Sequence, residues 1–368
     1  MRKKIFKNIE WGILVCTILL ILIGLVALFS ATQNTEYDEL KKQIIWLCIS
    51  IPIFVIIIFI DYELIAKVSP VFYGIMLILL IGVLFTDSVN GARSWFNIGA
   101  FSLQPSEFSK IFTILMFASV VTKIQERGKK QISRPTRLLI SLSVIAVPVF
   151  LIILQPDYGT AIAFLVATIM ILFAAGIDKK YIIVGILLVA IMLPLLYFFI
   201  LPEHAKTRID VYLNPNLDPR GSGYNIIQSK LAIGAGQLFG MGLLKGNQTQ
   251  LGFLYPKTTD FIFAVIGEEM GFVATSAIVV LYIILITKAI YVAKTAKDDL
   301  GSYIAMGIAG IFLFHMLENI GMTVGLLPIT GVPLPFVSYG GSSLLTNLIL
   351  IALLLNISGR RQRAIFVQ

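Results

Sequence analysis

Long apolar blocks separated by short polar stretches dominate this sequence of 368 residues. A helix that crosses a bilayer needs about 20 mostly apolar residues, and ten blocks approach this length. They are residues 11–31, 44–60, 69–86, 106–123, 138–154, 159–176, 181–201, 262–288, 301–325 and 338–358. Charged residues make up only 13% of the chain, against about 25% in soluble proteins. The pattern therefore predicts an all-α polytopic membrane protein with ten transmembrane helices.

The basic residues indicate how these spans lie in the membrane. Lys and Arg number 29 against 20 Asp and Glu, but they form small clusters rather than a basic face, so nucleic acid is not an expected partner. Roughly two-thirds of them fall in the segments on one side of the membrane, together with both chain ends. The positive-inside rule then predicts that both termini are cytoplasmic. We expect a single membrane domain, 1–368, with a large extracytoplasmic loop at 202–261.

No nucleotide-binding loop of the form Gly-x-x-x-x-Gly-Lys-Ser/Thr occurs in the chain, and no soluble domain is expected that would hold a nucleotide. ATP-driven transport is therefore disfavoured. Any chemistry in the outer loop must use a substrate that arrives already activated.

Several ionisable residues stand near the predicted outer ends of spans, where they are costly and usually paired or functional. Glu107 and Lys110 share a helix face, which fits a structural ion pair and a substrate contact equally well. Arg93 lies beside Trp95 and is either an interfacial anchor or a pyrophosphate contact, since guanidinium groups bind phosphate oxygens bidentately. Asp157 fits a helix cap first, and a functional carboxylate second.

A second group of polar residues lies around the eighth and ninth spans. Asp260 stands between the long loop and the eighth span, which fits a helix cap or a catalytic carboxylate. Glu268, two turns deeper, requires partners or water. His315, Glu318 and Asn319 share one side of the ninth span; a metal site is conceivable, but the absence of further ligands favours interhelical hydrogen bonds.

The segment 331–341, GVPLPFVSYGG, leads into the last span and contains Ser338. Its two prolines predict irregular backbone. Within a membrane such backbone is tolerated only where it is buried in protein or lines a wet cavity.

Several of these motifs together resemble the SEDS family (shape, elongation, division and sporulation). The combination occurs in the family's order, covers nearly the whole chain and is far more specific than any one motif. The matching segments are GARSW at 91–95, QPSE at 104–107 with Lys110, QPDYGT at 155–160, TDFIF at 259–263 with GEE at 267–269, and PLPFVSYGG at 333–341. The loop sequences at 218–225 and 246–251 are similar to the elongation (RodA) branch more than to the division (FtsW) branch.

The resemblance implies a peptidoglycan glycosyltransferase. Such an enzyme polymerises lipid II at the outer face of the bacterial cytoplasmic membrane, in cell-wall elongation and cell-shape maintenance, and releases undecaprenyl diphosphate. The family's catalytic aspartate maps onto Asp260. The residues expected to bind substrate are Arg93, Glu107, Lys110, Asp157, Glu268 and Ser338. The implied partners are lipid II, a class B penicillin-binding protein (a transpeptidase) and other membrane proteins of the elongation complex.

The chain departs from the family just before Asp260. Many relatives carry Leu-Pro-Glu-x-His there, whereas this chain reads LYPKT at 254–258, so the histidine is missing. Asp260 would act without it, either as a general base or as a ligand of a divalent cation, Mg²⁺ or Mn²⁺, for which Asp157 is a second candidate.

Two alternatives use the same residues. A lipid II flippase would line a path through the membrane with charged side chains, whereas a polymerase gathers them near the outer mouth, where the sequence places Arg93, Glu107, Asp157 and Asp260. A non-catalytic scaffold for a class B penicillin-binding protein is the other alternative.

Overall fold

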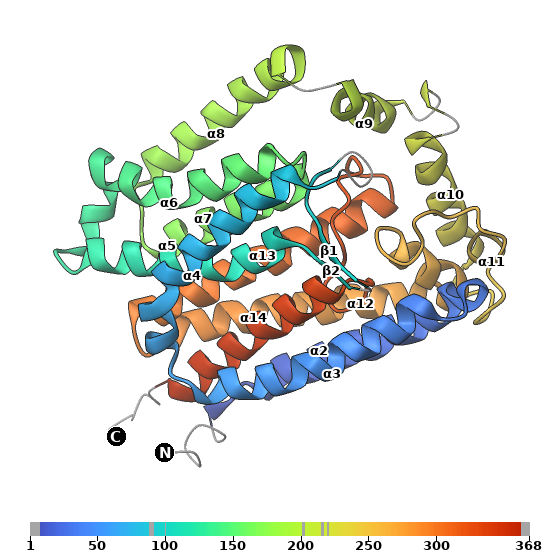
Figure 1. Ribbon diagram of the computed structural model, residues 1–368, viewed down its shortest axis with the longest axis horizontal. Helices are drawn as coiled ribbons and strands as arrows, with labels where there is room; N and C mark the ends of the chain where they lie inside the picture. The colour runs from blue at the N-terminus through green and yellow to red at the C-terminus, as the bar shows by residue number, and fades with distance from the viewer. Residues whose placement is uncertain are drawn as a thin grey trace.

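The chain forms a bundle of long helices (Figure 1). The computed structural model describes residues 8–87, 92–99, 101–200, 203–214, 217–218 and 221–361. Helices occupy all ten ranges expected from the apolar blocks. They are α2 (Trp11–Ala31), α3 (Asp38–Phe59), α4 (Tyr62–Gly82), α5 (Pro105–Gln125), α6 (Pro135–Ile153), α7 (Tyr158–Ala174), α8 (Lys179–Leu195), α12 (Ile262–Lys294), α13 (Asp299–Thr323) and α14 (Gly341–Arg360).

Seven of the helices in the described ranges are long and apolar enough to cross a membrane, namely α2, α3, α4 with the turn that follows it, α6, α12, α13 and α14. The chain is therefore a multi-pass membrane protein. The helix α5 carries two charged residues near its start, and α7 and α8 have 17 residues each. That all ten cross the membrane remains a prediction.

The remaining elements are short. One hairpin pairs β1 (Phe96–Ile98) with β2 (Phe101–Leu103) in antiparallel register, an exception to the expected all-α class. The predicted outer loop, 202–261, contains three helices in its described residues, α9 (Glu203–Leu213), α10 (Ser222–Ala235) and α11 (Asn247–Gln250). Tight turns lie at η1 (Gln33–Thr35), η2 (Val83–Phe85), η3 (Lys129–Ser133) and the π-helical η4 (Leu196–Ile200). The first and last basic clusters, together with Gly91 and Arg220, fall partly or wholly outside the described residues.

Local sequence explains where several helices begin. Aspartate side chains accept a backbone N–H at the starts of α4, α7 and α13, where they satisfy one of the otherwise unpaired donors of the first turn. Proline opens α5 and α6, where its missing N–H costs nothing.

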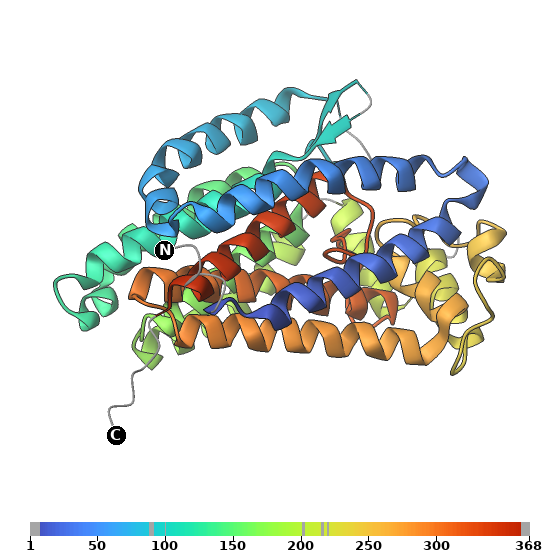
Figure 2. The same cartoon turned by 90° about the horizontal axis from the view of Figure 1, so that it is seen from below.

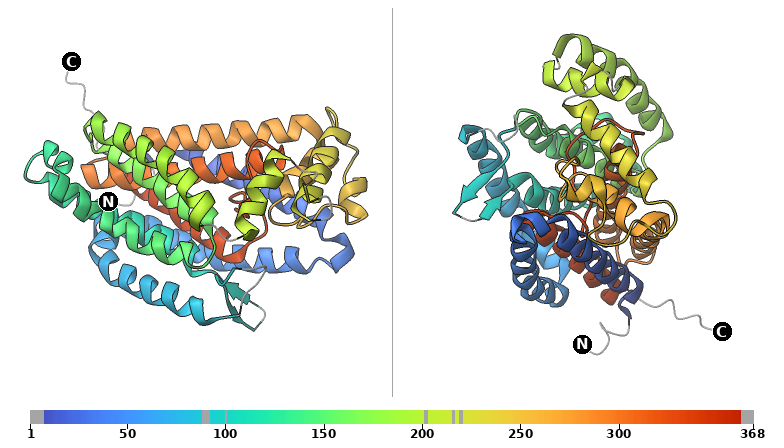
Figure 3. Two further views of the ribbon diagram at one scale, coloured as in Figure 1. Left: turned by 90° about the horizontal axis from the view of Figure 1, so that it is seen from above. Right: turned by 90° about the vertical axis from the view of Figure 1, so that its right-hand side faces the viewer.

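Burial divides the bundle into a centre and a rim. Within the apolar windows of α14 and α13, 94% and 78% of residues are buried, against 17% in α3 and α4. Small residues allow close approach in the centre: a Cβ on Gly310 of α13 would lie 2.8 Å from the Cα of Ala167 on α7. The helix α8 lies apart, along one edge of the molecule (Figures 1 and 3).

The helix α12 is broken at Gly271, whose φ of 76° and ψ of −170° are not helical. A straight part, 272–294, therefore follows a short entry helix, 262–270, and this differs from the expected single span at 262–288. A turn at 237–242 fills the break. The N–H groups of Phe272 and Val273 donate to carbonyls of the turn, and two N–H groups of the turn donate to the carbonyls of Glu268 and Glu269. Every backbone group named here is thus paired, as buried backbone groups in proteins nearly always are.

The described ends of the chain lie side by side (Figure 2). The Ser358 hydroxyl donates to the Asn8 carbonyl at 3.0 Å. Glu10 accepts from Lys288 of α12 at 2.8 Å and from Arg361 at 3.4 Å. These contacts join α2, α12 and α14 at one end of the bundle.

Candidate functional site

A buried ion pair lies near the start of α5. The Lys110 Nζ is 2.8 Å from Glu107 Oε1, and the two side chains are 0% and 2% exposed. The same Nζ lies 3.3 Å from Nε2 of His315 on α13. His315 Nδ1 is 3.2 Å from the Pro333 carbonyl oxygen, which can only accept, so Nδ1 carries the proton and Nε2 accepts from the lysine. This arrangement joins α5 to α13 through three polar side chains.

Asp260 is partly buried and immediately precedes the first residues of α12. Phe261, rather than Asp260, occupies the N-cap position of α12; the catalytic role of Asp260 stays a prediction. Its backbone is fixed from α13, because Asn319 Nδ2 donates to the Asp260 carbonyl at 3.0 Å. A Cβ on Gly331 would lie 3.7 Å from Asp260 Oδ2, so the carboxylate lies beside the start of segment 331–341.

The two residues before Asp260 are also held by segment 331–341. Ser338 Oγ donates to the Thr259 carbonyl at 2.7 Å and accepts from the Leu334 N–H at 2.9 Å. The Tyr339 N–H donates to the Thr258 carbonyl at 2.9 Å. Ser338 thus lies in the irregular segment 331–341, as expected, and supports the loop that carries Asp260.

Segment 331–341 has irregular backbone, as its two prolines predict, and most of it is buried in protein. Asn319 donates to the Val332 carbonyl at 2.9 Å, and Tyr282 of α12 donates to the Pro335 carbonyl. Gln43 of α3 donates to the Ser338 carbonyl at 3.2 Å and accepts from Gly340 at 3.1 Å. Sequence reasoning missed Gln43 and Tyr282. For Tyr282 the available signal was a polar group inside an apolar block, which must find a partner when it is buried; Gln43 stands just before the block 44–60, beside two lysines, and carried no such signal.

Asp157 joins the starts of α7 and α5. Its Oδ1 accepts from the Thr160 N–H at 3.1 Å, as the cap interpretation predicts, and its Oδ2 accepts from Gln104 Nε2 at 3.1 Å and from Ser106 Oγ at 3.4 Å. Burial raises the pKa of the Asp157 carboxyl, and the Thr160 hydrogen bonds oppose this shift. The charge of Glu107 adds to the shift, and the charge of Lys110 opposes it. The Asp157 carboxyl and the buried ion pair are therefore electrostatic neighbours.

Arg93 is exposed, and its guanidinium lies 3.4 Å from the Leu84 carbonyl. The adjacent Ser94 donates to the Gln155 carbonyl at 3.4 Å. The structure thus places Arg93 next to the turn that carries Asp157, with its charged group available to solvent.

Glu268 is fully buried and anchors the outer loop. Its Oε1 accepts from the Gln248 N–H at 2.7 Å, and its Oε2 accepts from the Thr249 N–H at 2.9 Å and the Thr249 hydroxyl at 2.7 Å. These are short, charge-assisted bonds. Because they hold α11 against α12, the geometry gives Glu268 a role in loop structure, and its contact with substrate stays a prediction.

Lys257, three residues before Asp260, donates to the Thr249 carbonyl at 2.9 Å. Burial lowers its pKa, while the charges of Glu269 and Glu39 oppose the shift. The loop is thus tied both to α12 and to the segment that carries Asp260.

Among the described residues, no group of three or more His, Cys, Asp or Glu side chains is arranged to hold a metal ion. On α13, His315 and Asn319 are engaged as described, and Glu318 accepts from Thr330 at 2.8 Å, which fits the favoured prediction of hydrogen bonding. Mg²⁺ commonly uses only one or two carboxylates together with substrate phosphates. Asp260 and Asp157 remain candidates for that arrangement.

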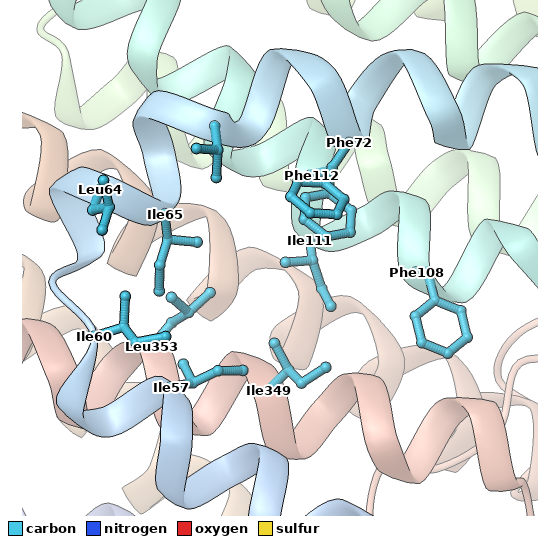
Figure 4. Close-up of a pocket in the computed structure, with 11 residues that line it drawn as sticks. Ile57, Ile60, Leu64, Ile65, Phe72, Phe108, Ile111, Phe112, Ile349 and Leu353 are labelled. Carbon is cyan, nitrogen blue, oxygen red and sulfur yellow. The ribbon is translucent and has the colours of Figure 1, made fainter.

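An apolar cavity of about 390 Å³ lies on another face of α5 (Figure 4). Its walls come from α3, α4, α5 and α14, and every lining side chain is a hydrocarbon. They are Ile57, Ile60, Leu64, Ile65, Val68, Phe72, Phe108, Ile111, Phe112, Ile349 and Leu353. A hydrocarbon chain fits such a wall, whereas a sugar or a phosphate does not.

These features define a multi-pass membrane protein in which carboxylates and a buried ion pair gather where the ends of α5, α7, α12 and α13 meet. The chain belongs to the FtsW/RodA/SpoVE family, described as cell cycle proteins, whose model matches residues 10–363.

The chain is also similar to individual relatives and solved structures. The chain is 37% identical over 336 residues to the peptidoglycan glycosyltransferase MrdB of Escherichia coli K12, covering 89% of each chain. A solved structure titled "Structural coordination of polymerization and crosslinking by a peptidoglycan synthase complex" matches with a TM-score of 0.82 and 27% identity, covering 95% of this chain and 97% of that one. The rod shape determining protein RodA of Thermus thermophilus matches with a TM-score of 0.72 and 26% identity, covering 96% and 98%.

Proposed function

We propose that this protein is a peptidoglycan glycosyltransferase that polymerises lipid II at the outer face of the cytoplasmic membrane during cell-wall elongation. One observation carries the proposal beyond the family. The loop of Asp260 is hydrogen-bonded to the buried, irregular segment 331–341. This segment lies at the same end of the bundle as Asp157. The positive-inside rule predicts that this end is extracytoplasmic. A polymerase needs its charged groups there, whereas a flippase needs them along a path through the membrane.

In the proposed reaction, Asp260 acts on the acceptor sugar. The 4-hydroxyl of its N-acetylglucosamine attacks C1 of the donor's N-acetylmuramic acid, so a glycosidic C–O bond forms. The bond from C1 to the phosphate oxygen breaks, its electron pair leaves with undecaprenyl diphosphate, and the hydroxyl proton passes to Asp260. General base catalysis of this kind contributes roughly 10²- to 10⁴-fold.

Positive charge must meet the departing diphosphate. The exposed Arg93 beside the Asp157 turn is suited to bidentate contact with phosphate oxygens. Lys110 is fully buried between Glu107 and His315, which favours support of the site over direct contact. A Mg²⁺ or Mn²⁺ ion held by Asp260 or Asp157 would supply further positive charge.

The prenyl chains of the two lipid substrates need an apolar surface within the membrane. The cavity between α3, α4, α5 and α14 offers one (Figure 4), because every side chain around it is a hydrocarbon. The helix α5 lines this cavity and also carries the Glu107–Lys110 pair. A lipid tail in the cavity would therefore contact the helix that also carries the pair.

The proposed orientation places both termini in the cytoplasm and has all ten helices crossing the membrane. The proposed partner is a class B penicillin-binding protein, together with other membrane proteins of the elongation complex. Support comes from the structural neighbour whose title describes a peptidoglycan synthase complex that coordinates polymerisation and crosslinking.

The test is polymerisation of labelled lipid II by the purified protein, with and without its class B partner, in Mg²⁺ or in chelator. We expect the wild type to make glycan chains and Asp260→Asn to lose at least about 100-fold in rate, because an amide cannot accept the proton. Asp178→Asn, a change at a half-exposed aspartate elsewhere, is the matched control and should leave the rate unchanged.

Equal activity of Asp260→Asn and the wild type would contradict the catalytic role of Asp260. Loss of all wild-type activity in chelator, with recovery on adding Mg²⁺, would favour the metal-ligand role. A wild type that makes no product even with partner and metal would contradict the polymerase function and favour the flippase or the scaffold.

A further inference from the structure

The strongest unexplained feature near Asp260 is the side chain of Asn319. It is 0% exposed, and its single amide nitrogen donates to two carbonyl oxygens, those of Asp260 at 3.0 Å and Val332 at 2.9 Å. Both partners are acceptors, so the NH₂ group must face them and the orientation of the amide is fixed by chemistry. Asn319 therefore donates both of its amide hydrogens, and it joins the loop of Asp260 to segment 331–341, which lies far from it in the sequence.

The preceding turn of α13 makes a related contact with segment 331–341. His315 lies four residues before Asn319 and contacts the carbonyl of Pro333, the residue after Val332. Its other ring nitrogen faces Lys110, which is paired with Glu107. A continuous set of polar contacts thus runs from the ion pair on α5, through α13 and two consecutive carbonyls, to the backbone of Asp260.

Resting on the proposed function, we propose that Asn319 is a positioning residue for Asp260: it fixes the carboxylate-bearing backbone relative to segment 331–341 and does not itself touch substrate. The physical reason is that Asp260 lies in the turn before α12, and the bond from Asn319 fixes its carbonyl to α13. Loss of this bond would remove one constraint on the backbone that carries the carboxylate, and the carboxylate would shift. A misplacement of 1 Å can cost about 10²-fold in rate.

The chain supplies a matched control at the other end of the bundle. Asn356 on α14 is also 0% exposed, and its amide nitrogen also donates to two carbonyl oxygens, those of Ile57 and Ile60. Ile57 lies in the last turn of α3 and Ile60 directly follows that helix. A change at Asn356 removes two hydrogen bonds of the same kind, together with the one that Arg360 donates to Asn356 Oδ1 at 2.6 Å.

The experiment compares Asn319→Leu with Asn356→Leu in the lipid II assay and in hydrogen exchange of the peptide around residues 256–263. We expect Asn319→Leu to lower kcat by about 100-fold with KM changed less than about threefold, and to speed exchange in this peptide. Asn356→Leu should leave both kcat and this exchange at wild-type values. Asn319→Asp, which keeps the shape but donates at most one hydrogen bond, serves if the leucine variant does not fold, and kcat should again fall.

Three results would overturn the proposal: wild-type kcat in a folded Asn319 variant, equal losses in the Asn319 and Asn356 variants, or unchanged exchange at 256–263. Wild-type and Asp260→Asn controls separate this from failure of the proposed function. If the wild type is inactive, the proposed polymerase function is wrong. The positioning role is then tested only by hydrogen exchange at residues 256–263. If the wild type is active and Asn319→Leu equals it, only the positioning role fails.

Discussion

The centre of the bundle and its rim use similar helices but are held together differently. In α13 and α14 most residues of the apolar window are buried, whereas in α3 and α4 only 17% are. The centre contains a buried ion pair, buried asparagines and tightly packed glycines; the rim exposes Ile, Val and Phe side chains to the space that lipid fills. Lipid tails are as apolar as leucine, so burying more leucine would not hold the centre together. Polar contacts and close packing perform that task, and the same contacts build the site.

Changing the buried ion pair is the strongest test of this difference between centre and rim. Glu107→Gln leaves the buried Lys110 charge without its paired carboxylate, and we expect the free energy of unfolding to fall by about 3–5 kcal/mol. Thermal or denaturant unfolding in detergent measures this loss. An unchanged stability would show that water reaches the pair and that it does not belong to the dry centre.

Removing the loop anchor should have the next largest effect. Glu268→Gln replaces a charged acceptor of three hydrogen bonds by a group whose NH₂ faces N–H donors, and we expect a loss of about 1.5–3 kcal/mol in holding the loop. Limited proteolysis should then cut near residues 246–257 more rapidly. A wild-type cleavage rate would contradict the anchoring role, and a raised KM for lipid II with unchanged cleavage would favour the predicted substrate contact.

A pair of glycine substitutions sharpens the contrast in packing. Gly310→Ala on α13 pushes a methyl group to within 2.8 Å of the α7 backbone and should destabilise by about 1–3 kcal/mol. Gly74→Ala on α4 meets nothing within 4 Å and should stabilise by about 0.5–1 kcal/mol, because alanine favours the helix. The two shifts in unfolding temperature should have opposite signs. The same sign for both would show that centre and rim do not differ in packing.

The smallest effect is expected at a surface ion pair. Lys297 lies 2.8 Å from Glu63, the same distance as in the buried pair, but the two side chains are 42% and 48% exposed. Glu63→Gln should cost about 0–1 kcal/mol and less in high salt. The hydrogen bond to Glu63 raises the pKa of Lys297 above 10.5, so this small contribution is present at neutral pH and is lost only as the pH rises through the raised value. A loss as large as that at Glu107 would contradict the comparison.

The sequence predicts the helices of this fold well, because a helix in lipid must carry an unbroken apolar block. It does not predict the break at Gly271, since glycine occurs in many intact membrane helices and only the packed turn at 237–242 explains this one. The helices α9 and α10 of the outer loop were not predicted, because they are short and polar enough to resemble loop sequence.

The sequence predicted which residues belong to the candidate site better than it predicted how they are arranged. The motifs place Asp157, Glu107 and Asp260 near the outer ends of spans, but the sequence cannot show that Asn319 and Ser338 hold the backbone around Asp260. Those contacts join segments separated by 59 and 79 positions. Nothing local in the chain specifies such pairings, because they depend on how the whole bundle packs.

The break in α12 limits how the outer loop can evolve. The turn at 237–242 and the two halves of α12 complete each other's hydrogen bonds, and a Cβ on Gly240 would lie 2.1 Å from the Glu269 carbonyl oxygen. A residue inserted in this turn would leave backbone groups unmatched at both helix ends unless α12 changed in step. Length variation among homologues should therefore collect around α9, at 203–213, while the turn and the break are inherited together as one unit.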